Sequence, residues 1–391
     1  MMRFFFIANR FLNSNKGTGK LTGMVSTLGI AIGCFALIIS VSVLNGFKSQ
    51  VNNKIKDFEG DIKISSVGLS DDVSIFDGVD EIKIVSPNRE RRGIIINGSK
   101  QKVVTFKEIN TNMVKHFYKI PIIGDYPNSK QVLVGYDIAS RLGIKVGDEI
   151  IISSPLDQKT ILGFLPSKKL QVSGLFHSKI LDYDNKFVFI PKNIGTKLFT
   201  NKNQVNAFDI KIKNPSKIMV VKKDLMELLG ENIKIESWKD RHSTLVKAMN
   251  MEKMGSMIVL SLIILVASFN MMATLSLITI KKIKDIGILR VLGSSVNDTQ
   301  KVLFSQAIII GGKGTVCGII IGVGFVLFQN LFGFIKLPGD IYAMDILPMV
   351  LTIFDMVIII SISLILIIIP GWFSARKVLN LKPIEAIRWV K

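Results

Sequence analysis

The chain has 391 residues and a formal net charge of +20, and 48% of its residues are hydrophobic. The hydrophobic residues gather in four stretches that contain no Asp, Glu, Lys or Arg: 21–47, 254–280, 314–335 and 356–375. A helix of about 20 residues crosses a hydrocarbon layer about 30 Å thick, so each stretch is long enough to span a membrane. Because lipid cannot satisfy free backbone groups, such continuous runs predict four transmembrane helices and exclude a soluble globular chain.

Residues 1–20 predict a cytoplasmic amphipathic helix that lies at the membrane surface. Arg3 and Arg10 fall on one side at helical spacing, and aromatic and aliphatic side chains cover most of the remainder. Transmembrane helix 1 follows at 21–47 and is longer than the apolar region of a usual signal peptide. The small-x-small pattern at 40–42 leaves cleavage as an alternative.

The segment 48–253 predicts a large α+β periplasmic domain inserted between transmembrane helices 1 and 2. Its first residues continue helix 1 outward, and alternating apolar residues bounded by turn signals predict strands. The predicted strands are Asp61–Ser65, Ile82–Val85, Gly93–Ile96, Lys102–Phe106, Glu149–Ser153, Lys169–Phe176 and Phe187–Ile190. The predicted helices are Tyr136–Leu142, Ile218–Leu229 and Ser237–Glu252, the last running into the second span.

The rest of the chain alternates between membrane spans and short connections. These are transmembrane helix 2 at 254–280, a cytoplasmic coupling loop at 281–301, helix 3 at 302–331, a periplasmic loop at 332–347, helix 4 at 348–371 and a cytoplasmic tail at 372–391. Within the coupling loop, Lys281–Leu292 predicts a short basic helix that Gly293 closes as a C-cap. One face of this helix carries Ile283, Ile286, Gly287 and Arg290.

The distribution of basic residues predicts the orientation of the spans. Fourteen Lys and Arg residues lie in the three segments assigned to the cytoplasm, whereas the short loop after helix 3 contains only Lys336. The positive-inside rule then places both termini in the cytoplasm and the large domain outside, as in a multi-pass protein of the bacterial inner membrane. The large domain contains no cysteine, so its own core must hold it together.

No catalytic or metal-binding pattern emerges from the sequence. The three histidines, His116, His177 and His242, lack metal-ligand spacing, and there is no G-x-S-x-G motif. The strings GTGK and GGKG lack the other Walker A positions and lie beside or inside a span. We therefore expect no enzyme activity, no cofactor and no ATP hydrolysis by this chain alone.

Two charges and a set of glycines stand out inside the spans. Gly314, Gly318 and Gly322 recur every four residues and predict a surface for close helix packing. Lys313 and Asp355 lie within helices 3 and 4, where charged side chains usually pair or face water. Pairing of Lys313 with Asp355, snorkelling of the lysine and a shifted span boundary all remain open.

The excursion 156–170, between two predicted strands, is too long for a tight hairpin. It carries an apolar tip beside a glycine and a proline, with basic residues around it, which favours protein docking over a loop folded onto its own domain. The residues concerned are Ile161, Leu162, Phe164, Leu165, Pro166, Lys168 and Lys169. The external segment 48–253 has a net charge of +10, which predicts contact with anionic lipid or an acidic partner rather than with nucleic acid.

Three sequences in the chain resemble a known family of permeases. They are STLGIAIGCFALIISVSVLNGF at 26–47, MEKMGSMIVLSLIILVASFNMMATLSLITIKKIKDIGILRVLGSS at 251–295, and PGWFSARKVLNLKPIEAIR at 370–388. The first ends in Asn-Gly-Phe and the second begins with Met-Glu-Lys, which point to the LolC/LolE lipoprotein-releasing permeases. The last resembles the C-terminal signature of the wider MacB/FtsX-like superfamily. The resemblance covers almost the whole chain.

This resemblance implies a permease subunit of an ATP-driven complex that extracts lipoproteins from the inner membrane. The implied partners are a LolD-like ATPase dimer that carries ATP and magnesium, a second LolC/LolE-type permease, a LolA-like periplasmic carrier, lipoprotein cargo and membrane lipid. It assigns ATPase coupling to the face of 281–292 together with Gly293, and carrier docking to the excursion 156–170 as a hook. A cargo route between the first two spans would use Leu37, Val41, Leu44, Phe47, Met257, Leu260 and Ile264.

Two other functions fit parts of the same pattern. A MacB-like efflux permease or an FtsX-like transmission permease would share the fold and differ in cargo. A membrane-anchored periplasmic sensor or enzyme is a different class, against which the missing catalytic pattern and the four spans both argue.

Overall fold

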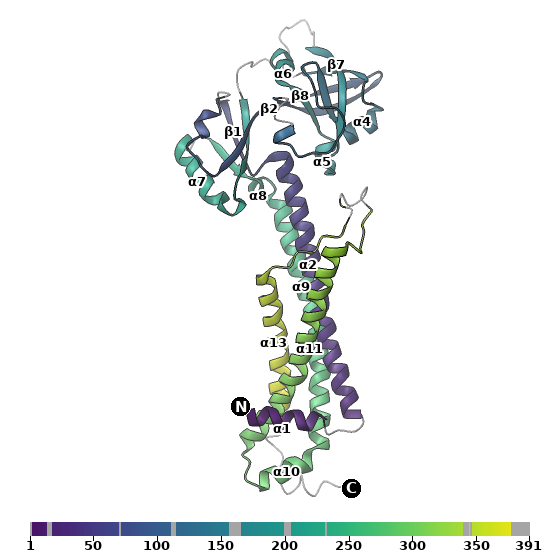
Figure 1. Cartoon of the computed structure of the whole chain (residues 1–391), viewed down its shortest axis with the longest axis vertical. Helices are drawn as coiled ribbons and strands as arrows, with labels where there is room; N and C mark the ends of the chain where they lie inside the picture. Colours follow the sequence, from purple (N-terminus) through teal and green to yellow (C-terminus); the bar gives the residue numbers. More distant parts are fainter. Residues whose placement is uncertain are drawn as a thin grey trace. The chain divides into compact units, whose positions relative to one another are not determined.

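The structure is a computed structural model that describes residues 2–13, 18–69, 72–110, 115–155, 166–198, 205–230, 233–338, 344 and 346–376. The chain forms two compact units (Figure 1). The membrane unit comprises Met1–Ser49, Lys247–Leu337 and Met344–Lys391, and the extramembrane unit comprises Gln50–Val246 and Pro338–Ala343.

The membrane unit is helical. Its elements are α1 (Met2–Asn13), α2 (Thr18–Glu59), α9 (Ser243–Lys281), α10 (Ile283–Val291), α11 (Val296–Phe332) and α13 (Ile353–Arg376), of which α2 and α9 also contribute residues to the extramembrane unit. Among the residues described, α2, α9, α11 and α13 are long and apolar enough to cross a membrane. The prediction of four membrane-spanning helices is therefore confirmed. The last helix begins at Ile353, five residues after the expected start of the fourth span.

The four long helices share one apolar core and approach closely at glycines. A Cβ atom added to Gly314 would lie 2.7 Å from the backbone oxygen of Thr27, and one added to Gly318 would lie 2.5 Å from that of Ala31. No larger residue fits there without displacing backbone, so α11 packs directly on α2 as the glycine spacing predicts. The core contains Ile30, Leu37 and Ile38 from α2, Ile264, Met271 and Leu275 from α9, Ala307 and Ile310 from α11, and Ile359 and Ile367 from α13.

The extramembrane unit is built on a mixed sheet. Its strands are β1 (Ile62–Leu69), β2 (Ile82–Asn97), β3 (Lys100–Ile109), β4 (Ile122–Gly124), β5 (Gln131–Gly135), β6 (Glu149–Ser153), β7 (Ser167–Phe176), β8 (Phe187–Pro191), β9 (Val205–Ile212) and β10 (Lys234–Ser237). Strands β2, β3, β8, β5, β7 and β6 pair in succession and β6 returns to β2, so these strands close a ring. The other half of β2 pairs with β9, which continues through β1 to β10.

Strand β2 corrects one detail of the predicted fold. The predicted strands Ile82–Val85 and Gly93–Ile96 are the two ends of a single strand. Its first half pairs with β9 and its second half with β3, and Val85 and Ile95 near its two ends belong to different hydrophobic cores. The polar residues between the two ends hid this continuity, because a strand that serves two neighbouring cores does not show one simple alternation.

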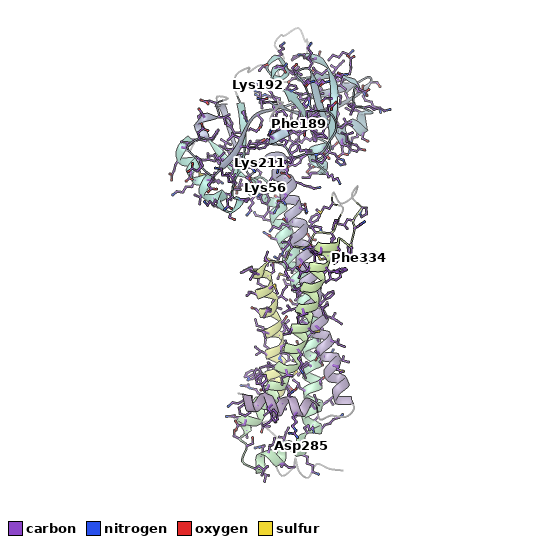
Figure 2. The ribbon with its side chains drawn as sticks, in the orientation of Figure 1. Lys56, Phe189, Lys192, Lys211, Asp285 and Phe334 are labelled. Carbon is purple, nitrogen blue, oxygen red and sulfur yellow. The ribbon has the colours of Figure 1, made fainter. Side chains whose placement is uncertain are left out.

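The short helices of this unit cover the sheet. They are α4 (Tyr136–Leu142), α5 (Leu181–Asp184), α6 (Lys192–Leu198), α7 (Ile218–Leu229) and α8 (Trp238–Arg241). The predicted bounds of α4, α7 and β6 are confirmed. Inside the unit, Phe189 is buried in an aromatic cluster with Phe58, Tyr118 and Phe176 (Figure 2). The predicted helix Ser237–Glu252 divides at His242 into α8 and the start of α9.

A buried ion pair joins two strands in the extramembrane unit. The Nζ atom of Lys107 on β3 lies 2.6 Å from Oδ2 of Asp209 on β9, and the two side chains are 1% and 0% exposed. Burial alone lowers the pKa of Lys107, but the adjacent Asp209 carboxylate holds that pKa well above its ordinary value. The ammonium also lies 5.1 Å from the ring centroid of Tyr118. The charged pair therefore forms part of the core rather than of the surface.

A second polar cluster in the same unit holds the end of α2 against α8. The Glu59 carboxylate accepts hydrogen bonds from Tyr183 at 2.7 Å and from Arg241 at 2.9 Å, and one of its oxygens lies 3.0 Å from Nε2 of His242. Burial acts to raise the pKa of Glu59, and the His242 and Arg241 contacts outweigh it and lower that pKa. Glu59 is therefore an ionised anchor at the last residue of α2.

Candidate functional site

The coupling segment forms a compact helix, as predicted. Helix α10 ends where the N–H of Gly293 donates to the carbonyl of Arg290 at 3.1 Å, with a φ of +99° at the glycine. That positive φ is easily adopted only by glycine, which explains the stop. A short turn then leads to Ser295, whose hydroxyl accepts the N–H of Asp298 at the start of α11. The end of α10 and the start of α11 are therefore both capped, one on each side of this turn.

The exposed face of α10 differs from the predicted one. Ile283 and Ile286 are only 6% and 3% exposed, and Gly287 is buried as well. Helical spacing correctly groups these residues on one face, and that face is buried within the membrane unit. The exposed apolar residues are Ile288, Val291 and Leu292, at 48%, 70% and 78%. Arg290 is half-buried and Gly293 is exposed. The available contact surface is therefore Ile288, Val291 and Leu292, which we call the α10 apolar tip.

Helix α1 lies across the same end of the membrane unit (Figure 1). It packs against α11, and the Nζ atom of Lys301 lies 5.5 Å from the ring centroid of Phe4. An ammonium over an aromatic face at this distance gives a weak cation–π attraction. Helix α1, α10 and the first turns of α11 therefore form a basic end of the membrane unit, beside the α10 apolar tip.

The strands that flank the predicted hook form a regular hairpin base. Strands β6 and β7 are antiparallel, with Ser153 opposite Ser167, and the N–H of Ser154 donates to the carbonyl of Pro166 at 3.2 Å. The four predicted tip residues, Ile161, Leu162, Phe164 and Leu165, lie outside the described residues. The base of the excursion is therefore closed by backbone pairing up to Ser154 and Pro166.

Two lysines from other parts of the unit act on Lys168 at this hairpin base. Burial lowers the pKa of Lys168 on β7, and the positive charges of Lys197 on α6 and Lys130, just before β5, lower it further. Neighbouring Lys169 instead forms an ion pair with Glu149 on β6. Sequence reasoning selected Lys168 and Lys169 but missed Lys130 and Lys197, because only the ring of strands brings them together.

Asp355 is the centre of a polar cluster at one end of the spans. Its carboxylate lies 2.6 Å from Nζ of Lys253 on α9, and it accepts hydrogen bonds from Asn45 on α2 at 2.6 Å and from Thr352 at 2.5 Å. The hypothesis that Asp355 pairs with Lys313 is therefore wrong. Lys253 lies one residue outside the charge-free stretch, where an ammonium reaches water, and it is the partner that the fold supplies.

The proposed cargo-route residues separate into two groups. Leu37, Val41 and Ile264 are fully buried inside the membrane unit, and Leu37 and Ile264 belong to its apolar core. These three side chains are not exposed in this chain by itself, and their place in a cargo route stays a prediction. Phe47 is 42% exposed, and Leu44, Met257 and Leu260 are half-buried. Among the described residues, no group of three or more His, Cys, Asp or Glu could hold a metal ion.

Comparison with known proteins identifies two regions of the chain. Residues 24–228 match the MacB-like periplasmic core domain, and residues 257–383 match the FtsX-like permease C-terminal domain. The chain is 26% identical to the lipoprotein-releasing system transmembrane protein LolC of Neisseria meningitidis serogroup B, over 98% of each chain. It is 24% identical to the LolE protein of Haemophilus influenzae, also over 98% of each chain.

Among solved structures, the periplasmic region of MacB from Actinobacillus actinomycetemcomitans is similar to this chain at 13% identity and a TM-score of 0.36. The similarity covers 50% of this chain and 97% of that region. The MacB-like domain spans more than half of the chain, and the FtsX-like domain covers much of the remainder. The matches to LolC and LolE also cover 98% of each chain. The chain therefore belongs to the MacB/FtsX-like family of permeases and is of the LolC/LolE type.

Proposed function

We propose that this chain is the permease subunit of an ATP-driven complex that extracts lipoproteins from the inner membrane. The observation that carries the proposal is the match to LolC and LolE proteins over 98% of both chains, which includes the membrane spans and the domain between them. In the orientation that the positive-inside rule predicts, α10 and both termini are cytoplasmic and the extramembrane unit is periplasmic. The excess of basic residues beside α10 supports that orientation.

An energy source is needed because lipoprotein anchors bind membranes tightly. At about 0.8 kcal/mol per buried CH₂, three acyl chains of about 16 carbons hold a cargo molecule by roughly 30–40 kcal/mol. Spontaneous release into water at that cost is too rare to be useful. ATP and magnesium would be bound by a LolD-like ATPase dimer, and a LolA-like carrier would receive the cargo. A second LolC/LolE-type permease would complete the membrane assembly.

The α10 apolar tip supports contact with the ATPase. Val291 and Leu292 are the most exposed apolar residues on a short helix that caps and turns hold in place. Exposed apolar side chains on a rigid element gain free energy when a partner covers them. The buried face of α10, with Ile283 and Ile286, would transmit the movement to the spans, and the exposed face would receive it.

Replacing Leu292 with Asp, alone or with Val291→Asp, is expected to weaken ATPase association by about 30-fold or more. A central apolar anchor in an interface contributes about 2 kcal/mol, and a buried carboxylate adds a further cost. Co-purification of the ATPase with the full chain in mild detergent measures association, and release from proteoliposomes measures function.

The matched control is Lys284→Met, which changes an exposed residue on the same helix and leaves the α10 apolar tip intact. It should retain both association and release. Normal release by the Leu292→Asp variant would refute the proposed contact. Because Leu292 is 78% exposed, we expect the variant to fold.

The hook distinguishes lipoprotein transfer from the efflux and transmission functions of MacB-like and FtsX-like relatives. Deleting Ile161–Leu165 is expected to abolish transfer to a LolA-like carrier while the extramembrane unit stays folded. Pro166 is retained, because its carbonyl accepts the Ser154 N–H that closes the hairpin base. Carrier pull-down by the full chain measures binding, and hydrogen exchange of the β6 and β7 amides measures folding.

A Gly-Ser segment of equal length is the matched control for loop closure. It should fail to bind the carrier in the same way, whereas Lys130→Met with Lys197→Met should weaken binding mainly at low salt. Full carrier binding by a folded deletion variant would argue against the hook and favour a MacB-like or FtsX-like function. Loss of β6 and β7 protection would indicate that the loop folds onto its own domain.

A further inference from the structure

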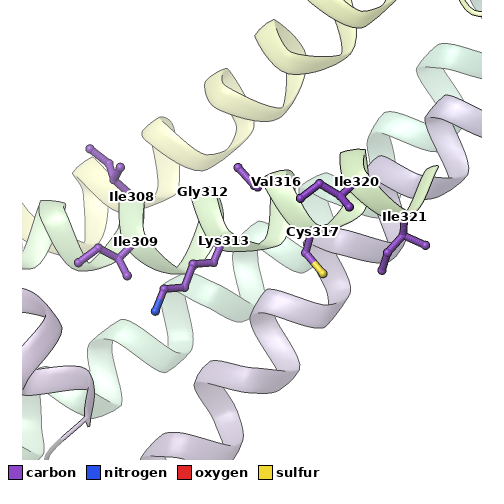
Figure 3. Close-up of a pocket in the computed structure, with 8 residues that line it drawn as sticks. All are labelled: Ile308, Ile309, Gly312, Lys313, Val316, Cys317, Ile320 and Ile321. Atoms are coloured by element: carbon purple, nitrogen blue, oxygen red, sulfur yellow. The ribbon is translucent and has the colours of Figure 1, made fainter. Parts of the chain in front are cut away.

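Helix α11 has a hollow that is lined by residues of this helix alone (Figure 3). The hollow has a volume of about 540 Å³ and is lined by Ile309, Val316, Ile320 and other residues of α11. Val316 and Ile320 are 57% and 66% exposed. Lys313 is the one charged residue in this lining. The combination is a long apolar surface with a single cation.

The opposite side of α11 is already occupied. Its glycines approach α2 and α13, as Gly314 does at Thr27 and Gly311 at the side chain of Ile367. The hollow therefore faces away from the contacts that hold the membrane unit together. Its size falls within the range of ligand-binding sites, about 300–1,000 Å³.

The packing of α11 on α2 gives the depth of Lys313. Gly314 lies beside Thr27 and Ile30, so Lys313 is level with about residue 27 of α2. The charge-free stretch 21–47 has its middle at Cys34. Seven residues at 1.5 Å each put the Lys313 backbone about 10 Å from the middle of the bilayer, on the side of the N-terminus. The half-thickness of the hydrocarbon layer is about 15 Å, so the lysine lies about 5 Å inside its boundary.

The side chain of Lys313 points toward that boundary. Figure 3 shows its nitrogen directed toward the end of α11 that carries Ile309, which is the N-terminal end of the helix. A lysine near the edge of the hydrocarbon layer snorkels in this way to reach headgroups. In the part of the chain that the structure describes, no acidic side chain forms an ion pair with Lys313, and Asp355 is bound to Lys253. An anion at the membrane surface would neutralise the positive charge of Lys313.

We propose that this hollow binds an anionic phospholipid from the cytoplasmic leaflet. The phosphate would contact the Lys313 ammonium, and an acyl chain would lie along Val316 and Ile320 toward the middle of the bilayer. Basic positions beside membrane helices on the cytoplasmic side attract anionic headgroups by this electrostatic mechanism. The leaflet follows from the orientation proposed above, whereas lipid binding itself is independent of lipoprotein cargo.

The test compares lipid retention by the full chain and by matched lysine variants. Each protein is purified in mild detergent, incubated with mixed micelles of phosphatidylglycerol and phosphatidylcholine, and analysed by native mass spectrometry. The Lys313→Met variant should lose about fivefold in preference for phosphatidylglycerol. The Lys313→Arg variant should keep that preference, and so should Lys336→Met, which removes an exposed lysine beyond the other end of α11.

Unchanged phosphatidylglycerol preference in Lys313→Met would overturn the proposal, and so would its loss in Lys313→Arg. A second copy of this chain is the competing occupant of the hollow. If Lys313→Met changes the oligomeric state and leaves lipid retention unaltered, the surface is a contact between copies and the lipid site is wrong. Loss of transport with normal lipid preference would affect the proposed function alone, so the two proposals fail separately.

Discussion

Replacing Lys253 with Met is expected to destabilise the membrane unit by about 3 kcal/mol, at the lower end of the cost of breaking a buried ion pair. The Asp355 carboxylate is 3% exposed and would keep only its hydrogen bonds from Asn45 and Thr352. Because the Lys253 side chain is 26% exposed, water reaches this site and partly solvates the carboxylate that is left unpaired. We therefore expect a cost at the lower end of the range. The cluster joins α2, α9 and the start of α13, so its loss should loosen three helices together.

Thermal unfolding of the detergent-solubilised chain, followed by size-exclusion chromatography, measures this effect. The double variant Lys253→Met with Asp355→Leu should recover most of the stability, because it removes both charges and leaves no uncompensated carboxylate. Lys336→Met serves as the control for loss of an exposed lysine. If the single Lys253 variant is as stable as the unaltered chain, the cluster contributes nothing to the packing of these helices.

The elements that the sequence predicted best are those with strong local signals. Helix α4 ends at Gly143 with a φ of +68°, and helix α7 follows Pro215. Both therefore have a start or stop signal that can be recognised in a single sequence. The four spans likewise follow from continuous apolar runs. Their existence depends on composition over about 20 residues and needs no information about neighbours.

The parts that were missed depend on distant residues. Strand β9 contains Asp209, which interrupts its apolar pattern and suggests a loop, although that carboxylate is fully buried against Lys107 of β3. The same limit applies to α10: spacing identifies which residues share a face, but only tertiary packing shows that Ile283 and Ile286 point inward. The partner of Asp355 was missed for this reason as well, since Lys253 is distant in sequence.

The buried ammonium of Lys107 also affects the acid response of the extramembrane unit through Glu90. Burial opposes ionisation of the neighbouring Glu90, but Lys107 and Lys63 outweigh it and lower the pKa of Glu90 from 4.5 to about 2. A carboxyl group with a lowered pKa adds stability above its unfolded pKa, and the gain is lost as the pH falls. The contribution of Glu90 is therefore present above about pH 4.5 and disappears as the pH approaches 2.

Replacing Asp209 with Ala is expected to destabilise the extramembrane unit by about 3–5 kcal/mol. The Lys107 side chain is 1% exposed and would lose the carboxylate at 2.6 Å, while Glu90 remains at 3.4 Å from the same ammonium. That second contact is longer, and Glu90 also binds Lys63 at 2.7 Å. It compensates only in part, so the variant retains a buried cation with too little negative charge around it.

Hydrogen exchange of the β3 and β9 amides in the full chain measures the effect, because opening of these strands should become easier by a comparable free energy. Glu227→Ala is the matched control: its partner Lys223 is 78% exposed, and loss of such a surface pair costs about 0.3–0.5 kcal/mol. The variant Asp209→Leu with Lys107→Met should regain protection, since it replaces the two charges with apolar groups. If Asp209→Ala and Glu227→Ala have equal effects, water reaches the Lys107 ammonium in the native state, and the ion pair does not hold β3 to β9.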